Sequence, residues 1–230
     1  MTDGFVTIAT EGSRALAGYL ARPDRAPAHG IVVLSDMFGL NKPIREIADR
    51  YAQRGYLALV PNLFWRSGNP GVISYDDANH AEAWERLKAL DLEVTTGDIG
   101  RAVGWLRAEP SCTGKVAAIG FCGGGRLAYL AAARAGVDGA AALYGLGIAS
   151  HLDELAKVNC PLQLHYGLND QHIPRQEIDA VAAGLRGSPI AQVFLYPEAG
   201  HSFANPVRPT YDPAAAALAF ERVDRMLANL

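Results

Sequence analysis

One cysteine lies in a glycine-rich turn between a predicted strand and a predicted helix. The stretch Lys115–Leu130 contains a buried strand over Val116–Ile119, a turn that carries Cys122, and the first turns of a helix. From Gly120 onward the residues follow G-x-C-x-G-G, the cysteine counterpart of the G-x-S-x-G nucleophile elbow. At a helix N-terminus, free N–H groups and the helix dipole favour a thiolate. The pattern therefore predicts that Cys122 is a nucleophile.

A cysteine nucleophile needs two partners, and the later strands are followed by suitable residues. A thiol is mostly protonated at neutral pH, so an imidazole must hold its proton, and a carboxylate must orient the imidazole. Asp170 and His201 each follow a predicted strand, and the order nucleophile, acid, histidine is that of the α/β-hydrolase fold. We therefore predict a triad of Cys122, His201 and Asp170, with Asn169 and His172 as neighbouring competitors of Asp170.

Acyl transfer also passes through an oxyanion, which needs two fixed N–H donors. The elbow supplies one donor from the N–H of Gly123. The loop Asp36–Gly39 follows the predicted strand Gly30–Leu34 and is placed to supply another, from Met37. Asp36 itself has two interpretations, a carboxylate that faces the thiol or a turn residue that caps its own loop.

The elements that must position these residues alternate between strand and helix. From Gly30 onward the alternation predicts right-handed βαβ units and a mostly parallel central sheet of about eight strands flanked by helices, after an N-terminal antiparallel hairpin. No linker or repeat interrupts the pattern, so we expect a single α/β-hydrolase domain over residues 1–230. The strands are predicted at residues 5–10, 16–21, 30–34, 56–60, 116–119, 139–144, 161–166 and 191–196. The helices are predicted at residues 43–55, 81–92, 97–107, from the elbow onward, and at 151–158, 174–185 and 213–229.

Composition excludes several classes of function. The chain has 230 residues, a formal net charge of −3 and three cysteines. No basic surface for nucleic acid, no secretory signal, no membrane-spanning segment and no clustered metal ligands are visible. We expect a cytoplasmic protein that needs no cofactor or metal, does not bind nucleic acid or membrane, and is a monomer or weak homodimer.

The ordered motifs resemble one family. The chain is similar to the dienelactone hydrolases (carboxymethylenebutenolidases) of the α/β-hydrolase superfamily, whose elbow matches Gly120–Gly125. The family's acidic loop matches Gly167–Asp170, and its A-G-H-S-F segment matches Ala199–Phe203. The resemblance covers nearly the whole chain. It implies cysteine-dependent hydrolysis of a small-molecule ester or lactone through a thioester.

The sequence departs from that family at its substrate-binding positions. The resemblance implies a thiol-activating glutamate where this chain has Asp36, and two carboxylate-binding arginines where it has His80 and Asn205. Imidazole and amide do not replace a bidentate guanidinium clamp equivalently, so dienelactone itself should bind weakly. The arginines that remain as candidates to compensate are Arg66, Arg126 and Arg208.

Other residues are predicted to contact substrate, although aromatic side chains belong to the core more often than to a ligand. These predicted contacts are Phe38, His80, Trp84, Tyr144, Phe203 and Asn205. Two other classes of function stay open: a catalytically silent relative that binds a ligand, and a nucleotide-binding protein. The glycine pattern G-x-x-G-G-G does not favour the second, because dinucleotide folds carry G-x-G-x-x-G early in the chain.

Overall fold

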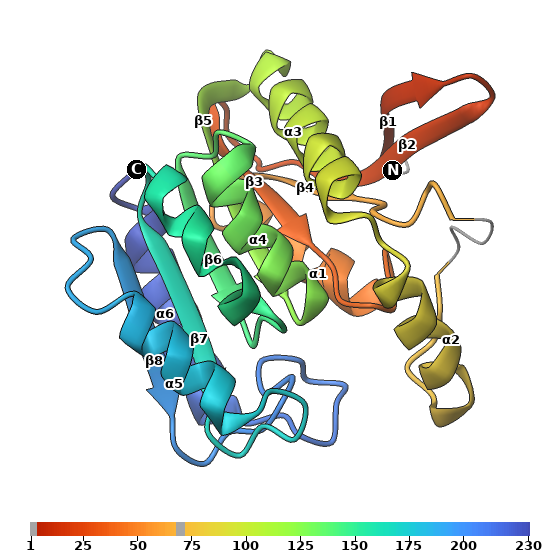
Figure 1. Ribbon diagram of the computed structural model, residues 1–230. Coiled ribbons are helices and arrows are strands. Elements are labelled where there is room, and N and C mark those ends of the chain that lie inside the picture. The colour runs from red at the N-terminus through yellow and green to blue at the C-terminus, as the bar shows by residue number, and fades with distance from the viewer. Residues whose placement is uncertain (1–3, 68–71) are drawn as a thin grey trace. The chain divides into compact units, whose positions relative to one another are not determined.

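The structure, a computed structural model, describes residues 4–67 and 72–230 (Figure 1). The described strands form an eight-stranded sheet in the order β1-β2-β4-β3-β5-β6-β7-β8. The mostly parallel sheet, the flanking helices and the N-terminal antiparallel hairpin confirm the predicted α/β fold class. The chain divides into two compact units, residues 1–117 and 118–230, and a single domain stays a prediction.

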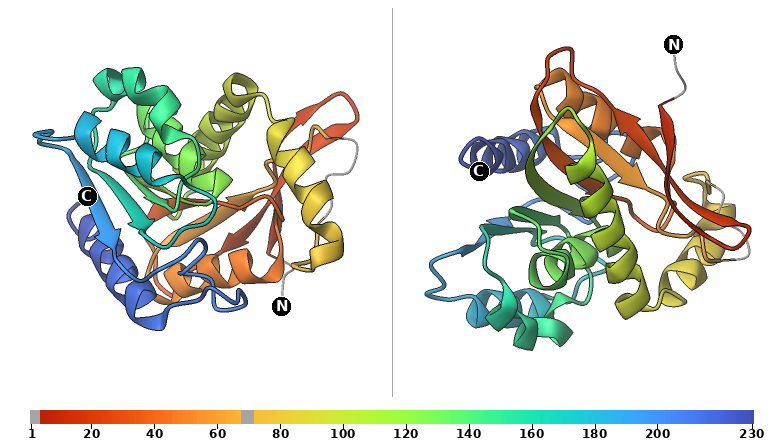
Figure 2. Two further views of the ribbon diagram at one scale, coloured as in Figure 1. Left: turned by 60° about the horizontal axis from the view of Figure 1, so that its bottom comes forward. Right: turned by 90° about the horizontal axis from the view of Figure 1, so that it is seen from above.

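The first unit is built on an antiparallel hairpin followed by a parallel pair of strands. Strand β1 pairs antiparallel with β2, β2 pairs antiparallel with β4, and β3 pairs parallel with β4. Helix α1 lies on one face of these strands and α3 on the other (Figure 2). The bounds are β1 Phe5–Glu11, β2 Arg14–Ala21, β3 Ala28–Leu34, α1 Lys42–Gln53, β4 Leu57–Pro61, α2 Asp77–Lys88 and α3 Leu92–Ala108. Strand β5, Cys112–Phe121, follows, and the two units divide within it.

The second unit alternates helices with parallel strands. Strand β6 pairs with β7 and β7 with β8, all parallel. Helices α4 and α5 lie on one face of these strands and α6 on the opposite face (Figure 2). The bounds are α4 Gly123–Arg134, β6 Gly139–Leu143, the 3-10 helix η1 Ile148–Lys157, β7 Leu162–Gly167, α5 Arg175–Gly184, β8 Ala191–Tyr196 and α6 Pro213–Leu227.

Strand composition explains the core. Residues 30–34 of β3 and the whole of β6 are unbroken apolar runs, and residues 31–34 and 140–143 are at most 1% exposed. Such continuous burial is typical of parallel strands covered by helices on both faces. The loops that follow β3 and β6 are therefore anchored by buried strands.

Two helices begin well before their predicted starts. Helix α2 begins at Asp77 and α3 at Leu92, four and five residues before the predicted starts. Asp76 caps α2 by accepting a hydrogen bond from the Asn79 N–H, and Asp91 caps α3 by accepting from two backbone N–H groups. Apolar spacing marks the buried face of a helix, whereas capping side chains determine where it begins.

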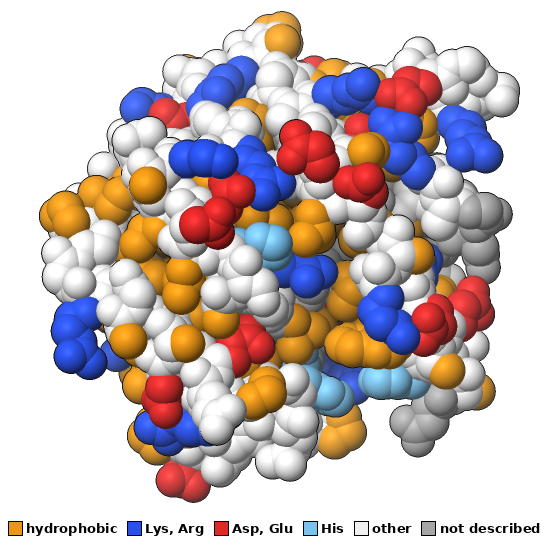
Figure 3. Space-filling view, viewed as in Figure 1, with side chains coloured by type: hydrophobic (Ala, Val, Ile, Leu, Met, Phe, Trp, Pro, Cys, Tyr) orange, Lys and Arg blue, Asp and Glu red, His pale blue; other side chains and the backbone are white. Residues whose placement is uncertain are grey.

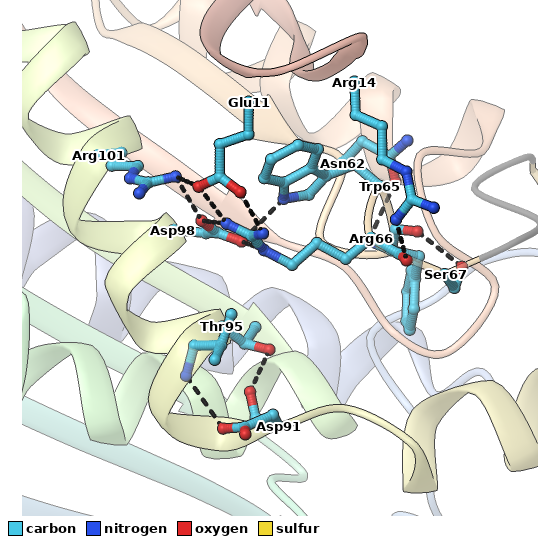
Figure 4. A network of polar contacts seen from close by, with 12 residues as sticks. Glu11, Arg14, Asn62, Trp65, Arg66, Ser67, Asp91, Thr95, Asp98 and Arg101 are labelled. Atoms are coloured by element: carbon cyan, nitrogen blue, oxygen red, sulfur yellow. Dashed lines mark hydrogen bonds and ion pairs between the residues drawn. The ribbon is translucent and has the colours of Figure 1, made fainter.

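A polar network joins the hairpin to α3 in the first unit (Figure 4). The Asp98 carboxylate, with a side chain only 4% exposed, accepts hydrogen bonds from the Trp65 indole at 2.8 Å and from Arg66 Nε at 2.8 Å. Arg66 also binds both oxygens of Glu11, at 2.6 and 2.8 Å, and Arg101 contacts the same carboxylate. Arg66 and Arg101 lower the pKa of Glu11 to about 2.

Because Asp98 is the buried carboxylate of this network, its removal should cost more than loss of a surface carboxylate. Asp98→Ala should lower the free energy of unfolding by about 2–3 kcal/mol, since a charged acceptor with several donors is lost. Asp179→Ala, which breaks the exposed pair between Arg175 and Asp179, should cost less than about 1 kcal/mol. Urea denaturation of both variants measures the difference, and equal losses would contradict a structural role for Asp98.

Candidate active site

The turn between β5 and α4 has the geometry of a nucleophile elbow. Cys122 is the N-cap residue of α4 and has φ 57° and ψ −120°, a conformation that non-glycine residues rarely adopt. Its N–H donates to the carbonyl of Leu143 at 3.1 Å, and its own carbonyl accepts from the Gly125 N–H at 2.9 Å. These bonds hold Cys122, which is 6% exposed, at the start of the helix.

Two glycines make this turn possible. A Cβ atom on Gly120 would lie 1.8 Å from the carbonyl oxygen of Gly124, a distance that no side chain tolerates. A Cβ atom on Gly125 would lie 2.7 Å from the Cα of Gly145, so α4 approaches the end of β6 at backbone contact. The glycines of the motif therefore shape the turn rather than bind phosphate.

The histidine and aspartate predicted to serve Cys122 form a direct pair. His201 Nδ1 lies 2.8 Å from Asp170 Oδ2, and the Asp170 side chain is fully buried. The other Asp170 oxygen accepts from the backbone N–H groups of His172 and Ile173, at 2.7 and 2.9 Å. Asp170 therefore holds both the imidazole and its own loop, and His201 Nε2 is left for another partner.

That partner is Cys122. Burial lowers the pKa of His201, but the charge of Cys122, a hydrogen bond to Asp170 and a hydrogen bond to Cys122 outweigh it and raise this pKa to about 10. Burial likewise raises the pKa of Asp170, but its hydrogen bonds, chiefly that with His201, hold it below its usual value. The second unit thus brings Cys122, His201 and Asp170 together.

The competitors of Asp170 have other positions. The His172 ring packs edge-on against His201 with centroids 4.8 Å apart, but the carboxylate that reaches His201 Nδ1 is that of Asp170. The amide of Asn169 donates to the carbonyl of Glu198 at 3.1 Å. Neither residue replaces Asp170 beside the imidazole.

Aromatic side chains surround His201. Tyr144 lies 5.2 Å from the His201 ring and 5.3 Å from Phe203, both measured between centroids. Tyr144 has φ 41° and Ser202 has φ 62°, so two non-glycine residues beside the histidine have strained backbone. Tyr144 and Phe203 are at most 2% exposed, and they therefore act first as packing for the imidazole.

Asp36 and Met37, which are also predicted to belong to the site, lie in a loop of the first unit. Asp36 Oδ1 accepts the Phe38 N–H at 2.9 Å, and Asp36 Oδ2 accepts the Tyr75 hydroxyl at 2.5 Å. Both bonds are those expected of Asp36 as a turn residue. The pairing of Asp36 with Cys122 stays a prediction. The Met37 carbonyl accepts from Arg86 Nη2 at 2.7 Å, and the role of Met37 in an oxyanion hole also stays a prediction.

The predicted substrate contacts differ in exposure. Phe38 is buried and meets the half-buried His80 ring at 6.3 Å between centroids, whereas Trp84 is 36% exposed. Asn205 is buried, and its side-chain oxygen accepts the Val207 N–H at 3.2 Å. Whether these residues contact a substrate stays a prediction.

Sequence reasoning missed two residues that organise the Asp36 loop. Tyr75 and the buried Arg86 hold this loop from outside it, and neither belongs to a motif. Their hydrogen bonds span 39 and 49 residues of sequence, and no local pattern signals such a pairing.

Three arginines are candidates to replace the two carboxylate-binding arginines of the family, and they have different surroundings. Arg66 is bound by Glu11 and Asp98, so its charge is already balanced inside the first unit. Arg208 lies in the turn after Asn205. Arg126 is half-buried on α4, where Cys122 acts on its charge.

Among residues 4–67 and 72–230, no group of three or more His, Cys, Asp or Glu side chains could hold a metal ion. The same part of the chain contains no helix long and apolar enough to cross a membrane. On the face in Figure 3, acidic and basic side chains are interspersed.

A parallel sheet with a nucleophile elbow after β5, an acid after β7 and a histidine after β8 defines the class of α/β-hydrolases. The chain belongs to the dienelactone hydrolase family, whose model matches residues 16–230. It is therefore a carboxylic ester hydrolase of that family.

Relatives match over the full length. The chain is 34% identical over 232 residues to the carboxymethylenebutenolidase of Pseudomonas putida, covering all of this chain and 98% of the relative. It is 33% identical to a putative carboxymethylenebutenolidase of Azospirillum brasilense, covering 95% and 94% of the two chains. The crystal structure of a putative dienelactone hydrolase from Klebsiella pneumoniae is 27% identical, with a TM-score of 0.87 and coverage of 99% and 98%.

The pair of His201 and Cys122 generates a prediction about protonation. Because the pKa of His201 in the folded protein lies above 6.5, its protonation contributes stability that is fully present below pH 6.5 and lost as the pH rises through about 10. Cys122→Ser removes the anionic partner and should lower the pKa of His201 by about one unit or more.

NMR titration of the imidazole Cε1–H signals measures this change. His165 is the internal control, because burial lowers its pKa to about 3, and it should stay neutral from pH 5 to 10 in both proteins. An unchanged His201 titration in Cys122→Ser would show that the thiol does not act on the imidazole.

Proposed function

We propose that this protein hydrolyses small-molecule esters or lactones with Cys122 as nucleophile, His201 as base and Asp170 as orienting acid. The observation that carries the proposal is the position of His201, which binds Asp170 through Nδ1 and has Cys122 as its other partner. A buried cysteine without such a partner would be inert.

The reaction follows from this arrangement in two steps. His201 holds the proton of Cys122, and the thiolate attacks the acyl carbon, forming a C–S bond while the carbonyl electrons move to oxygen. The N–H of Gly123, at the first position of α4, is the proposed donor to this oxyanion. The tetrahedral intermediate expels the alkoxide, which takes its proton from His201, and leaves a thioester.

Water then releases the product. His201, now neutral, removes a proton from the water, the hydroxide attacks the thioester carbon, and the thiolate leaves. Asp170 keeps the imidazole in one orientation through both steps and stabilises its protonated form.

Membership of the dienelactone hydrolase family supports this proposal. The proposed class of substrate is inferred from the names of the relatives. Several are carboxymethylenebutenolidases by name, and a structural neighbour is a promiscuous phosphotriesterase similar to dienelactone hydrolase. We infer a lactone or ester for this chain. The cytoplasmic location and the monomeric or weakly dimeric state are part of the proposal.

Removing the nucleophile tests the mechanism. Cys122→Ala should lower kcat for p-nitrophenyl acetate about 10³-fold or more, because no other group on the elbow can form the acyl-enzyme. The matched control is Cys112→Ala, which removes a half-buried cysteine outside the elbow and should leave kcat unchanged. Normal turnover by Cys122→Ala would refute the mechanism.

The same samples discriminate the other two classes of function. Mass spectrometry of acid-quenched enzyme should find one acetyl group on the peptide that contains Cys122. A catalytically silent relative would show neither acetylation nor turnover. A nucleotide-binding protein would be stabilised by a dinucleotide and be indifferent to thiol reagents.

The missing arginines generate a separate prediction about specificity. The KM for dienelactone should exceed the KM for a neutral aryl ester, because His80 and Asn205 stand where the resemblance implies guanidinium groups. Asn205→Arg, which restores one guanidinium, should lower the KM for dienelactone and leave that for the neutral ester unchanged. Steady-state kinetics on both substrates measures this, and a wild-type KM for dienelactone far below that for the neutral ester would contradict it.

A further inference from the structure

The backbone carbonyl of His201 is bound by a side chain from the loop that precedes α6. The Thr210 hydroxyl donates to this carbonyl at 2.5 Å, across nine residues of sequence. A Cβ atom on Gly200 would lie 3.5 Å from the Thr210 methyl carbon, an ordinary van der Waals distance, so the methyl group lies beside the residue before the histidine. Because threonine is branched at Cβ, its side chain has few rotamers. Thr210 therefore contacts the histidine segment through both branches of its side chain.

The peptide group that Thr210 binds leads into strained backbone. The His201 carbonyl belongs to the peptide between His201 and Ser202, and Ser202 has φ 62°. A non-glycine residue in this conformation persists only where its surroundings hold it. The Ser202 carbonyl accepts the Asn205 N–H at 2.9 Å, which closes a turn after the strained residue but does not bind the histidine. The hydrogen bond from Thr210 therefore fixes the orientation of the peptide group at His201.

Thr210 is itself anchored to helix α6. Two residues later, the Asp212 N–H donates to the carbonyl of Phe203 at 3.0 Å, so the segment before α6 and the histidine segment are joined twice. The Asp212 carboxylate caps α6 by accepting two backbone N–H groups of its first turn, both at 3.0 Å. Helix α6 in turn has a buried face. The bond from Thr210 therefore links the histidine to a capped and packed helix.

The chain before the histidine is fixed separately, by the loop that carries Asp170. The Ala199 carbonyl accepts the Asn169 N–H at 3.0 Å. A Cβ atom on Gly167 would lie 2.2 Å from the same carbonyl oxygen, so the two loops meet at backbone contact. The bond between His201 Nδ1 and Asp170 Oδ2 adds a side-chain connection. These contacts do not fix the peptide after the histidine, and that peptide is the one bound from the segment before α6.

We infer that Thr210 is a positioning residue whose hydroxyl holds the His201 backbone, and with it the imidazole, in place beside Asp170. The inference rests on the proposed function, in which His201 is the base. Thr210 is exposed, so water can hydrate the carbonyl when the hydroxyl is removed, but water does not connect the histidine to α6. Loss of the hydroxyl should therefore affect the position of the imidazole more than the stability of the fold.

The test begins with Thr210→Val, which removes the hydroxyl and keeps the shape of the side chain. Its kcat for p-nitrophenyl acetate should fall about 10-fold with an unchanged KM, because a displaced base slows the chemical step without weakening substrate binding. Thr210→Ser keeps the hydroxyl and should restore most of kcat. Steady-state kinetics on the full-length proteins measures these values, and thermal unfolding confirms that each variant is folded.

Thr95→Val is the matched control. The Thr95 hydroxyl donates to the Asp91 carbonyl at 2.6 Å, which is the same type of bond, at the start of α3 in the first unit. Each of the two valine variants should lower the unfolding temperature by about 2–4 °C, because each loses one hydrogen bond. Only Thr210→Val should lower kcat. An equal loss of kcat in the two variants overturns the inference, because activity would then follow stability rather than the position of the imidazole.

The proton on His201 Nδ1 reports the bond to Asp170 without turnover. NMR of isotope-labelled protein detects this proton, and its signal is assigned by its absence in His201→Gln. Its exchange with water should be faster in Thr210→Val than in the wild type and in Thr210→Ser, because an imidazole that is free to shift breaks its bond to Asp170 more often. Either an unchanged exchange rate or an unchanged kcat in folded Thr210→Val overturns the inference.

The proposed function and the role of Thr210 fail in distinguishable ways. If Cys122→Ala keeps normal turnover while the Nδ1 proton exchanges faster in Thr210→Val, the proposed function fails but the hold of Thr210 on the imidazole stands. If Cys122→Ala is inactive while Thr210→Val keeps the wild-type kcat and exchange rate, the proposed function stands and the inference is wrong.

Discussion

The strained turn at Cys122 is the constraint on which the rest of the second unit depends. A non-glycine residue at φ 57° costs on the order of 1–3 kcal/mol and persists only where its surroundings hold it. Here the carbonyl of Leu143 accepts the Cys122 N–H, and Gly120 has no Cβ to strike Gly124. Because strand, turn and helix are locked together, the thiol meets His201 without further adjustment. Strand β5 and helix α4 thereby keep Cys122 at the buried N-terminus of α4.

Charge balance is the second requirement of this site. Cys122, His201 and Asp170 are buried, and burial alone would disfavour every charge among them. The three groups instead form a chain in which each charge faces an opposite one, and the backbone N–H groups of His172 and Ile173 satisfy the remaining oxygen of Asp170.

The first unit stabilises its own loop by different means. Asp36 closes a turn through the Phe38 N–H and is tied to Tyr75, while Arg86 holds the Met37 carbonyl and lies over the Phe64 ring at 4.0 Å from its centroid. A buried arginine that donates to a backbone carbonyl and stacks on an aromatic ring restrains a loop through these two contacts, without a salt bridge to the loop. Loops that follow parallel strands carry function when they are held in this way.

The sequence by itself determined the alternation of strands and helices and the elbow turn, because glycines and apolar runs act locally and leave a pattern. It also proposed Cys122, Asp170 and His201 as a triad, from their places after predicted strands. It misplaced the starts of α2 and α3, where the caps Asp76 and Asp91 rather than apolar spacing decide the boundary. Only the tertiary structure decided that Asp170 rather than His172 meets His201, and that Arg66 is bound by Asp98 and Glu11. These pairings join residues tens of positions apart. They depend on how helices pack on strands, and that packing is a property of the folded chain rather than of any segment.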